Sequence, residues 1–239
     1  MRGSRESPRA GSRASGRPGA TSIARAAACK RAPQSRYPLA NDRLCNPWVD
    51  CEPSLDLPDA PARHIANLRG YLHAHRDAKW MLVGQEAGYA GCRFSGVPFT
   101  GEDLLEGPKA LPIFVAAGAR RSSARNKLMT ERSANFVWPC IGSDGKVVLW
   151  NSLPFHCHEP GKPLTNRAWT PKDDRDGMAE KILRHMIEKV APGARLIAVG
   201  RKAERTLQSL GYEALAVRHP SQGGATIFRG QMAEILGKR

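Results

Sequence analysis

The chain has 239 residues, 41% of them hydrophobic and 25% charged, and carries a formal net charge of +15 at pH 7. That length supports one well-packed domain of roughly 200 residues with a tail. No run approaches the ~18 apolar residues of a transmembrane helix, so we expect no membrane partner. The strongly basic balance favours polyanionic partners, nucleic acid first.

The first 38 residues differ in composition from the rest. They contain nine Lys or Arg and a single acid, Glu6, so the remaining residues still carry a charge of +7. Because this stretch has too little apolar bulk to form a core, we predict a disordered basic tail over residues 1–40 and a folded domain over residues 41–239. The tail also resembles an organelle transit peptide. An extension of little consequence and a basic arm with non-specific DNA affinity are the alternatives.

Hydrophobic runs and breaker residues then predict alternating strands and helices. In chain order we expect an irregular segment (44–61), a helix (62–75), a strand that breaks at Gly84 (80–83), a short helix (102–105), a strand that ends at Asn151 (146–150), a helix (177–190), a strand (195–199), a helix (201–210), a strand (214–217) and a closing helix (228–236). This alternation predicts a single three-layer α/β/α domain with a short, mainly parallel central sheet.

Residues 111–136 show little clear period and crowd five basic residues together, Arg120, Arg121, Arg125, Lys127 and Arg132. Such a run is usually a solvated face, and a DNA-facing insertion is the sharper alternative.

One stretch, MLVGQEAGYAGCRFSGVPFTGE over residues 81–102, has the character of a ligand-binding loop. It follows a predicted buried strand and contains repeated glycines, which let a backbone approach a ligand closely. Its amide, acid and aromatic side chains suit a planar polar ring. A long structural loop whose glycines only serve turns is the competing interpretation.

This stretch resembles motif one of the uracil-DNA glycosylase superfamily. Residues 84–89 (GQEAGY) are similar to the branch whose motif begins Gly-Gln-Asp, and residues 96–101 (GVPFTG) are similar to a bacterial and archaeal branch that often carries an iron–sulfur cluster. Asn151 resembles the asparagine that reads the uracil edge, and His219-Pro220-Ser221 resembles motif two. The resemblance covers residues 41–239.

The resemblance implies a DNA repair glycosylase that flips uracil, or a related deaminated base, out of DNA and hydrolyses its N-glycosidic bond. Its substrate would be uracil-containing DNA, single- or double-stranded, and the protein would be a monomer in the bacterial cytoplasm, associated with the nucleoid through DNA. The alternatives are a catalytically inactive DNA-binding protein on the same fold and a small-molecule-binding α/β protein.

Site residues follow from the matching motif positions. The expected catalytic pair is Glu86, which would position water, and His219, which would donate as a neutral imidazole to the developing base anion. The expected base-binding residues are Gly84, Gln85, Tyr89, Phe99 and Asn151, with Phe94 as a second candidate for stacking. The expected DNA-phosphate contacts are Ser221, Arg167 and Lys162, with Arg218 as a further candidate.

Each of these residues also has an ordinary structural interpretation. Glu86 could only accept backbone N–H groups, Phe99 could be a core residue, and Asn151 could end its strand as a turn residue. Gln85 occupies the place of the acid in the related branch, so two registers are possible. His219 could be a common loop histidine.

The chain departs from the family pattern in two features. The six cysteines lack the related branch's cluster spacing, because none follows Cys157 and Cys45 and Cys51 are too far apart, so we expect no cluster, no metal and no other cofactor. Residues 222–224 (QGG) replace the usual Pro-Leu-Ser, so the leucine wedge is absent there, and Ile227 and Phe228 are the candidates to replace it.

Overall fold

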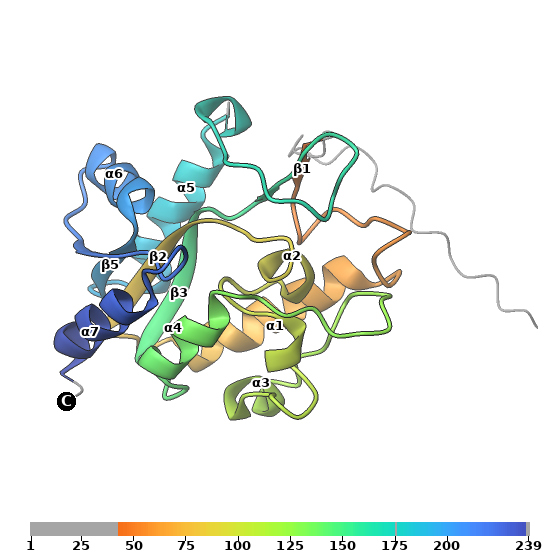
Figure 1. Ribbon diagram of the computed structural model, residues 1–239, viewed down its shortest axis with the longest axis horizontal. Helices are drawn as coiled ribbons and strands as arrows, with labels where there is room; N and C mark the ends of the chain where they lie inside the picture. Colours follow the sequence, from red (N-terminus) through yellow and green to blue (C-terminus); the bar gives the residue numbers. More distant parts are fainter. Residues whose placement is uncertain (1–42, 175, 238–239) are drawn as a thin grey trace, which may run out of the picture.

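The computed structural model describes residues 43–174 and 176–237, so the predicted basic tail lies outside the described residues. A four-stranded sheet in the order β3-β2-β5-β6 forms the centre of the domain (Figure 1). Its strands are β2 (Trp80–Glu86), β3 (Val147–Leu153), β5 (Arg195–Val199) and β6 (Leu215–Val217), and every neighbouring pair is parallel. The predicted α/β class and parallel sheet are confirmed.

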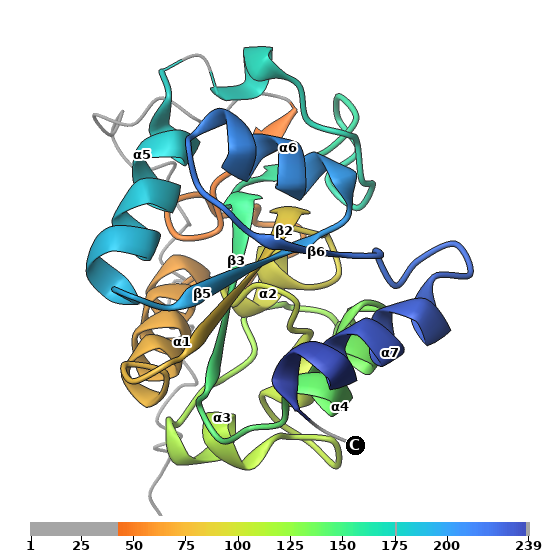
Figure 2. The same ribbon diagram turned by 90° about the vertical axis from the view of Figure 1, so that its left-hand side faces the viewer.

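Helices cover both faces of this sheet. The helices of the domain are α1 (Ala60–Ala74), α2 (Cys92–Ser95), α3 (Pro112–Ala116), α4 (Ala134–Ile141), α5 (Met178–His185), α6 (Arg201–Ser209) and α7 (Ala225–Leu236). There are also 3-10 turns at Glu102–Leu104 and Pro171–Asp174 and a π-helical turn at Met186–Val190. Helices α5 and α6 lie on one side of the sheet, and α1, α4 and α7 lie on the other (Figure 2). This arrangement is the expected three-layer α/β/α architecture.

Two strand boundaries differ from the predictions. The sequence predicts that the first strand breaks at Gly84 and that the next ends at Asn151, but the ladder continues through the pairs Gly84↔Asn151 and Glu86↔Leu153. Backbone pairing does not depend on side-chain polarity, so polar residues at the ends of two parallel strands remain in register. The consequence is that Glu86 and Asn151 are fixed by the sheet itself.

Besides the short helices α2 and α3, one strand pair and one helix are not among the predicted elements. Leu44–Cys45 forms a short strand, β1, although residues 44–61 were expected to be irregular, and it pairs antiparallel with β4 (His156–Cys157), where no strand was predicted. Helix α4 begins inside the basic stretch whose structure the sequence did not reveal, and contains Pro139. The first of these pairs the entry segment with the loop that follows β3.

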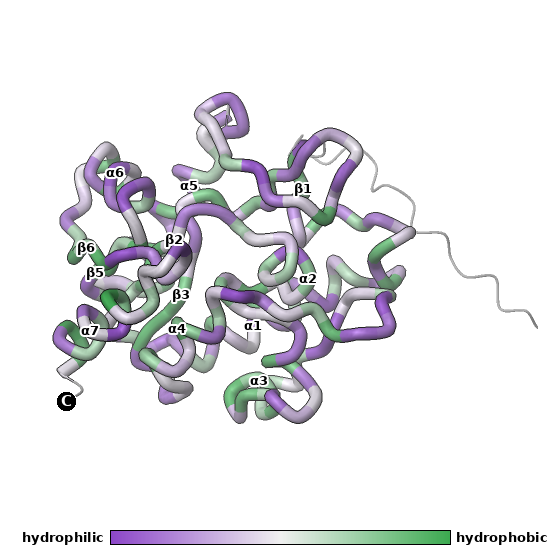
Figure 3. Tube along the Cα trace, viewed as in Figure 1, coloured by the Kyte–Doolittle hydropathy of each residue, from purple (hydrophilic) through white to green (hydrophobic). Residues whose placement is uncertain are grey.

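The core lies between the sheet and both helical layers. Met81, Leu82 and Val83 of β2 are fully buried, as are Leu149 of β3 and Ile197 of β5. In Figure 3 the tube is hydrophobic along much of β3. A strand covered on both faces needs a continuous apolar run rather than an alternating one, which is the pattern that these strands carry. No helix in the described part of the chain is long and apolar enough to span a bilayer.

Buried polar groups hold the glycine-rich stretch against the rest of the domain. Arg93 is fully buried and forms a bidentate ion pair with Asp56, with both N–O distances at 2.8 Å. The His64 ring lies 2.8 Å from the Phe94 carbonyl oxygen through Nε2 and 2.6 Å from the Pro47 carbonyl oxygen through Nδ1. These contacts fix the loop that begins at the end of β2.

Candidate active site

The site forms where β2 and β3 end. Side chains alternate across a strand, so Gly84 and Glu86 face the same side of the sheet as Asn151, which pairs with Gly84. The carboxyl edge of a parallel sheet is the usual place for ligands in this architecture. The two strands thus present an acid and an amide side by side.

The lack of a side chain at Gly84 leaves room for the ring of Phe99 beside Asn151. A Cβ at Gly84 would lie 2.3 Å from Cζ of Phe99 and 2.7 Å from Oδ1 of Asn151, so any other residue would displace both. Phe99 has φ of 53°, a left-handed conformation that bulky residues rarely adopt, and its carbonyl accepts a 3.1 Å hydrogen bond from Nε1 of Trp138. Strain of this kind persists only where the surroundings enforce it.

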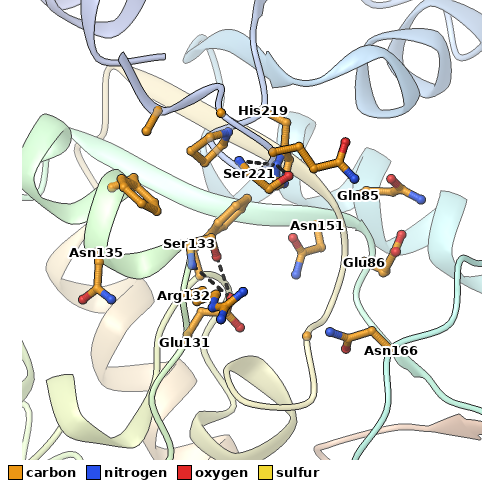
Figure 4. A pocket seen from close by; sticks show the side chains of 17 residues that line it. Gln85, Glu86, Glu131, Arg132, Ser133, Asn135, Asn151, Asn166, His219 and Ser221 are labelled. Carbon is orange, nitrogen blue, oxygen red and sulfur yellow. Dashed lines mark hydrogen bonds between the residues drawn. The ribbon is translucent and has the colours of Figure 1, made fainter. Parts of the chain in front are cut away.

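A cavity of about 680 Å³, which Phe99 helps to line, opens at this edge of the sheet (Figure 4). Its walls come from the end of β2, from Asn151, from the segment before and within α4, from the 158–167 loop and from the loop after β6. The lining residues are Gln85, Glu86, Gly88, Phe99, Glu131, Arg132, Ser133, Asn135, Phe136, Asn151, Asn166, His219, Pro220, Ser221, Gln222, Gly223 and Ala225. Six of the predicted site residues therefore meet in one cavity.

Glu86 has an unusual environment. Burial raises the pKa of Glu86 to about 7, although Lys202 and Arg167 act in the opposite direction. Its Oε2 is buried and has no hydrogen-bond partner among the described residues. A carboxyl group with a pKa near neutrality and a free oxygen can exchange a proton with a ligand or a water.

His219 is held as a neutral donor. Its Nδ1 accepts a hydrogen bond from the backbone N–H of Ser221 at 3.1 Å and lies 2.7 Å from the Ser221 hydroxyl oxygen. An Nδ1 that accepts from an N–H carries no proton, so the neutral ring has its proton on Nε2. Burial, together with Arg218, lowers the pKa of His219 below its ordinary value, which favours this neutral form.

Two amides in the cavity lack partners. Nε2 of Gln85 is buried without a hydrogen bond, and the Asn151 side chain makes none within the described residues, although Asn151 is only 3% exposed. Buried polar groups are normally paired, so unpaired ones that line a cavity are available to a ligand.

The remaining predicted residues are not among those that line the cavity. Tyr89 donates its backbone N–H to Oδ1 of Asn166 at 3.0 Å. The guanidinium of Arg167 forms an ion pair with Asp173 at 2.7 Å, and Lys162 is exposed. Phe94 is fully buried beside Arg93 and does not line the cavity. The two wedge candidates differ, since Ile227 is 55% exposed and Phe228 is fully buried.

One wall of the cavity was missed by the sequence analysis. It consists of the segment that leads into α4 and its first turn, with Glu131, Arg132, Ser133, Asn135 and Phe136. The only sequence signal was the basic residue Arg132, in a stretch interpreted as a solvated face or a DNA-facing insertion. Asn166 was also not assigned to the site.

No group of three or more His, Cys, Asp or Glu residues in the described ranges could hold a metal ion. Cys45, Cys92 and Cys157 are free thiols. Burial raises the pKa of Cys157 to about 12, which keeps it protonated. The described residues thus present no ligand set for a metal or a cluster.

The fold and the site define an α/β protein with a ligand pocket at the carboxyl edge of a parallel sheet. No family model and no curated protein matches the chain. Among solved structures, the crystal structure of wild-type SMUG2 from Pedobacter heparinus is similar, with a TM-score of 0.56 and 14% sequence identity. The match covers 82% of this chain and 86% of that chain. At this sequence identity the likeness establishes the shared fold.

Proposed function

We propose that the protein is a monofunctional DNA glycosylase that hydrolyses the N-glycosidic bond of uracil, or of a related deaminated base, after flipping the nucleotide out of DNA. The observation that carries the proposal is the convergence of Glu86, Phe99, Asn151 and His219 in one cavity, on a fold shared with SMUG2. A flipped base needs a stacking surface, an edge reader and a donor for its developing negative charge, and these side chains supply all three.

The geometry supports a role for each of these residues in the proposed reaction. Phe99 forms a fixed surface beside Asn151, whose amide offers both an N–H and a carbonyl to a base edge. The C1′–N bond breaks with its electron pair on the base, and the Nε2–H of His219 stabilises the resulting anion. Water then adds to C1′ of the cationic sugar and loses its proton to Glu86, whose pKa of about 7 suits that transfer.

Contacts to DNA surround the cavity. Arg132 is exposed at the cavity wall, Arg218 is exposed next to His219 of that wall, and Lys162 is exposed in the 158–167 loop, which contributes Asn166 to the wall. Cations in such positions neutralise phosphates and orient the duplex without reading sequence. In this proposal the hydroxyl of Ser221 orients His219, and Ile227 is the exposed apolar side chain available to fill the space left by the flipped base.

The test is a glycosylase assay on end-labelled oligonucleotides, single-stranded and duplex, with uracil opposite G or A. Abasic sites are scored by strand breakage after alkali. We expect breakage at uracil with the wild type and a loss of about 10²–10³-fold in the single-turnover rate for His219→Ala. The matched control is His185→Ala, which removes an exposed histidine of α5 and should keep the wild-type rate.

Other outcomes separate the alternatives. No base release from uracil, hypoxanthine or xanthine oligonucleotides, with salt-dependent DNA binding retained, would replace the proposal with a non-catalytic DNA-binding protein. Absence of DNA binding at low salt would exclude both interpretations. Equal losses of binding and turnover in His219→Ala would show that the variant is misfolded, and circular dichroism would confirm it.

A further inference from the structure

Glu131 is a carboxylate in the cavity wall for which the reaction outlined above has no role. One of its oxygens, Oε1, is held by Ser133, whose backbone N–H donates at 3.2 Å and whose hydroxyl donates at 2.7 Å. The other oxygen, Oε2, accepts no hydrogen bond from any described residue. In Figure 4 Glu131 lies on the side of the cavity away from Gln85 and Glu86.

Two glycines of the motif loop make room for this carboxylate. A Cβ at Gly88 would lie 2.7 Å from Oε2 of Glu131, and a Cβ at Gly91 would lie 2.3 Å from it. Neither glycine has a positive φ, so a left-handed backbone is not what these positions require. The loop that carries the predicted base-binding residues therefore closes directly onto Oε2.

The charge of this group restricts what it can face. A carboxylate repels phosphates and carbonyl oxygens, and it only accepts hydrogen bonds. A protein with a net charge of +15 gains nothing for phosphate binding from an acid at this place. Since Glu131 shares its cavity with Phe99 and Asn151, a donor on a bound base suits Oε2 better than the DNA backbone does.

Deamination creates such a donor. In cytosine and adenine the ring nitrogen beside the exocyclic amine is an acceptor, whereas in uracil and hypoxanthine the corresponding nitrogen carries a hydrogen. Asn151 cannot enforce this distinction alone, because nothing in the described residues fixes its amide and a rotated amide would donate instead. Glu131 is fixed by Ser133 and cannot donate.

We propose that Glu131 is a specificity-determining residue whose Oε2 accepts a hydrogen bond from the ring N–H of a deaminated base and disfavours the parent base. The inference rests on the proposed function and names the residue that would restrict it. It assigns Asn151 the carbonyl side of the base edge and Glu131 the ring N–H.

The experiment measures binding separately from chemistry. Oligonucleotides carrying a non-hydrolysable 2′-fluoro nucleotide of uracil or of cytosine are titrated by fluorescence anisotropy, and uracil release is measured in parallel. We expect the wild type to prefer the uracil oligonucleotide. In Glu131→Gln the Gln oxygen retains the Ser133 contacts and its N–H replaces Oε2. The uracil-to-cytosine affinity ratio should then fall about ten- to a hundredfold.

The control for lost charge is Glu213→Gln, an exposed glutamate outside the cavity, which should leave the ratio unchanged. An unchanged ratio in Glu131→Gln, in a wild type that releases uracil, would overturn this inference and leave the proposed function standing. A wild type that releases no base would overturn the proposed function instead.

A second pair of variants tests the geometry. Gly88→Ala should reduce the ratio by pushing the carboxylate aside, since the new Cβ would meet Oε2 at 2.7 Å. In a Glu131→Ala background the same change should have no further effect, because the clashing atom is gone. Additive effects would show that Gly88 acts independently of Glu131 and would contradict the assignment.

Discussion

Glu86 lies near the start of the glycine-rich stretch and Glu102 lies at its end, and their hydrogen bonding differs sharply. Glu102 is fully buried, and its Oε1 accepts from the backbone N–H groups of Ser122 and Ser123 at 2.8 and 2.7 Å. Its Oε2 accepts from the Ser123 hydroxyl at 2.6 Å and the Met129 N–H at 3.1 Å. Glu86 has a buried oxygen with no partner among the described residues.

The difference separates a carboxylate whose hydrogen bonding is complete from one that retains an unpartnered oxygen. Four donors offset the loss of hydration at Glu102, so it ties the 119–131 segment to the motif loop. Nothing offsets that loss fully at Glu86, and burial raises its pKa to about 7. A protein keeps such an uncompensated group where a ligand or a water completes its hydrogen bonding.

The largest effect is expected at Glu102. Glu102→Ala would leave four donors, three of them backbone N–H groups, without their acceptor inside the protein. Because each unsatisfied buried group costs about 1–3 kcal/mol, we expect a loss of at least about 4 kcal/mol in the free energy of unfolding. Urea denaturation followed by circular dichroism measures this loss. A loss below about 1 kcal/mol would show that water satisfies these donors and that the two glutamates differ less than their contacts indicate.

In contrast to Glu102→Ala, Glu86→Gln should lower activity and leave the fold intact. The variant should fold normally, and its single-turnover rate on a uracil oligonucleotide should fall about 10²–10⁴-fold, because the group that we propose as the general base is lost. In the wild type the rate should rise with pH through a midpoint near 7, because the ionised form of Glu86 is the one that accepts a proton. The residual rate of the variant should lack this rise. A variant rate with the same pH dependence would assign the titration to another group.

Phe99→Ala tests whether the aromatic ring that lines the cavity stacks on a bound base. Stacking of a base on an aromatic ring contributes about 1–3 kcal/mol, so we expect affinity for a uracil oligonucleotide to fall roughly five- to a hundredfold. The φ of 53° at this position is easier for a smaller residue, which limits the loss of stability. Unchanged affinity with a lower melting temperature would make Phe99 a core residue only.

Local patterns in the sequence were sufficient for the fold class and for one wall of the cavity. The apolar runs of β2, β3 and β5 mark buried parallel strands, and the polar residues at their ends indicate the carboxyl edge, so Glu86 and Asn151 could be placed there. His219 follows β6 closely and could be placed by the same reasoning. The ends of β2 and β3 could not be predicted in this way. Glycine usually breaks a strand and asparagine usually favours a turn, but Gly84 and Asn151 pair within the sheet.

The second wall depends on long-range contacts that no local pattern encodes. Glu131 enters the site because α4 packs under the sheet and delivers the segment before it to Gly88 and Gly91. In the sequence it is an acid within a basic, aperiodic stretch. The pairing of Glu102 with Ser122 and Ser123 is equally invisible, since it joins two loops across a buried interface.

The smallest effect concerns stability and separates the two glutamates in the same assay. The folded-state pKa of Glu86, about 7, is raised above its ordinary value of 4.5, so the folded protein binds a proton that the unfolded chain releases between these values. Stability should therefore fall as pH rises from about 4.5 to 7, and Glu86→Gln should remove this contribution. We expect the variant to melt at the wild-type temperature at pH 4.5 and a few degrees higher at pH 8. A variant that melts lower than the wild type at pH 8 would show that ionised Glu86 is stabilised by its surroundings, Lys202 and Arg167 first among them, and would remove the contrast with Glu102.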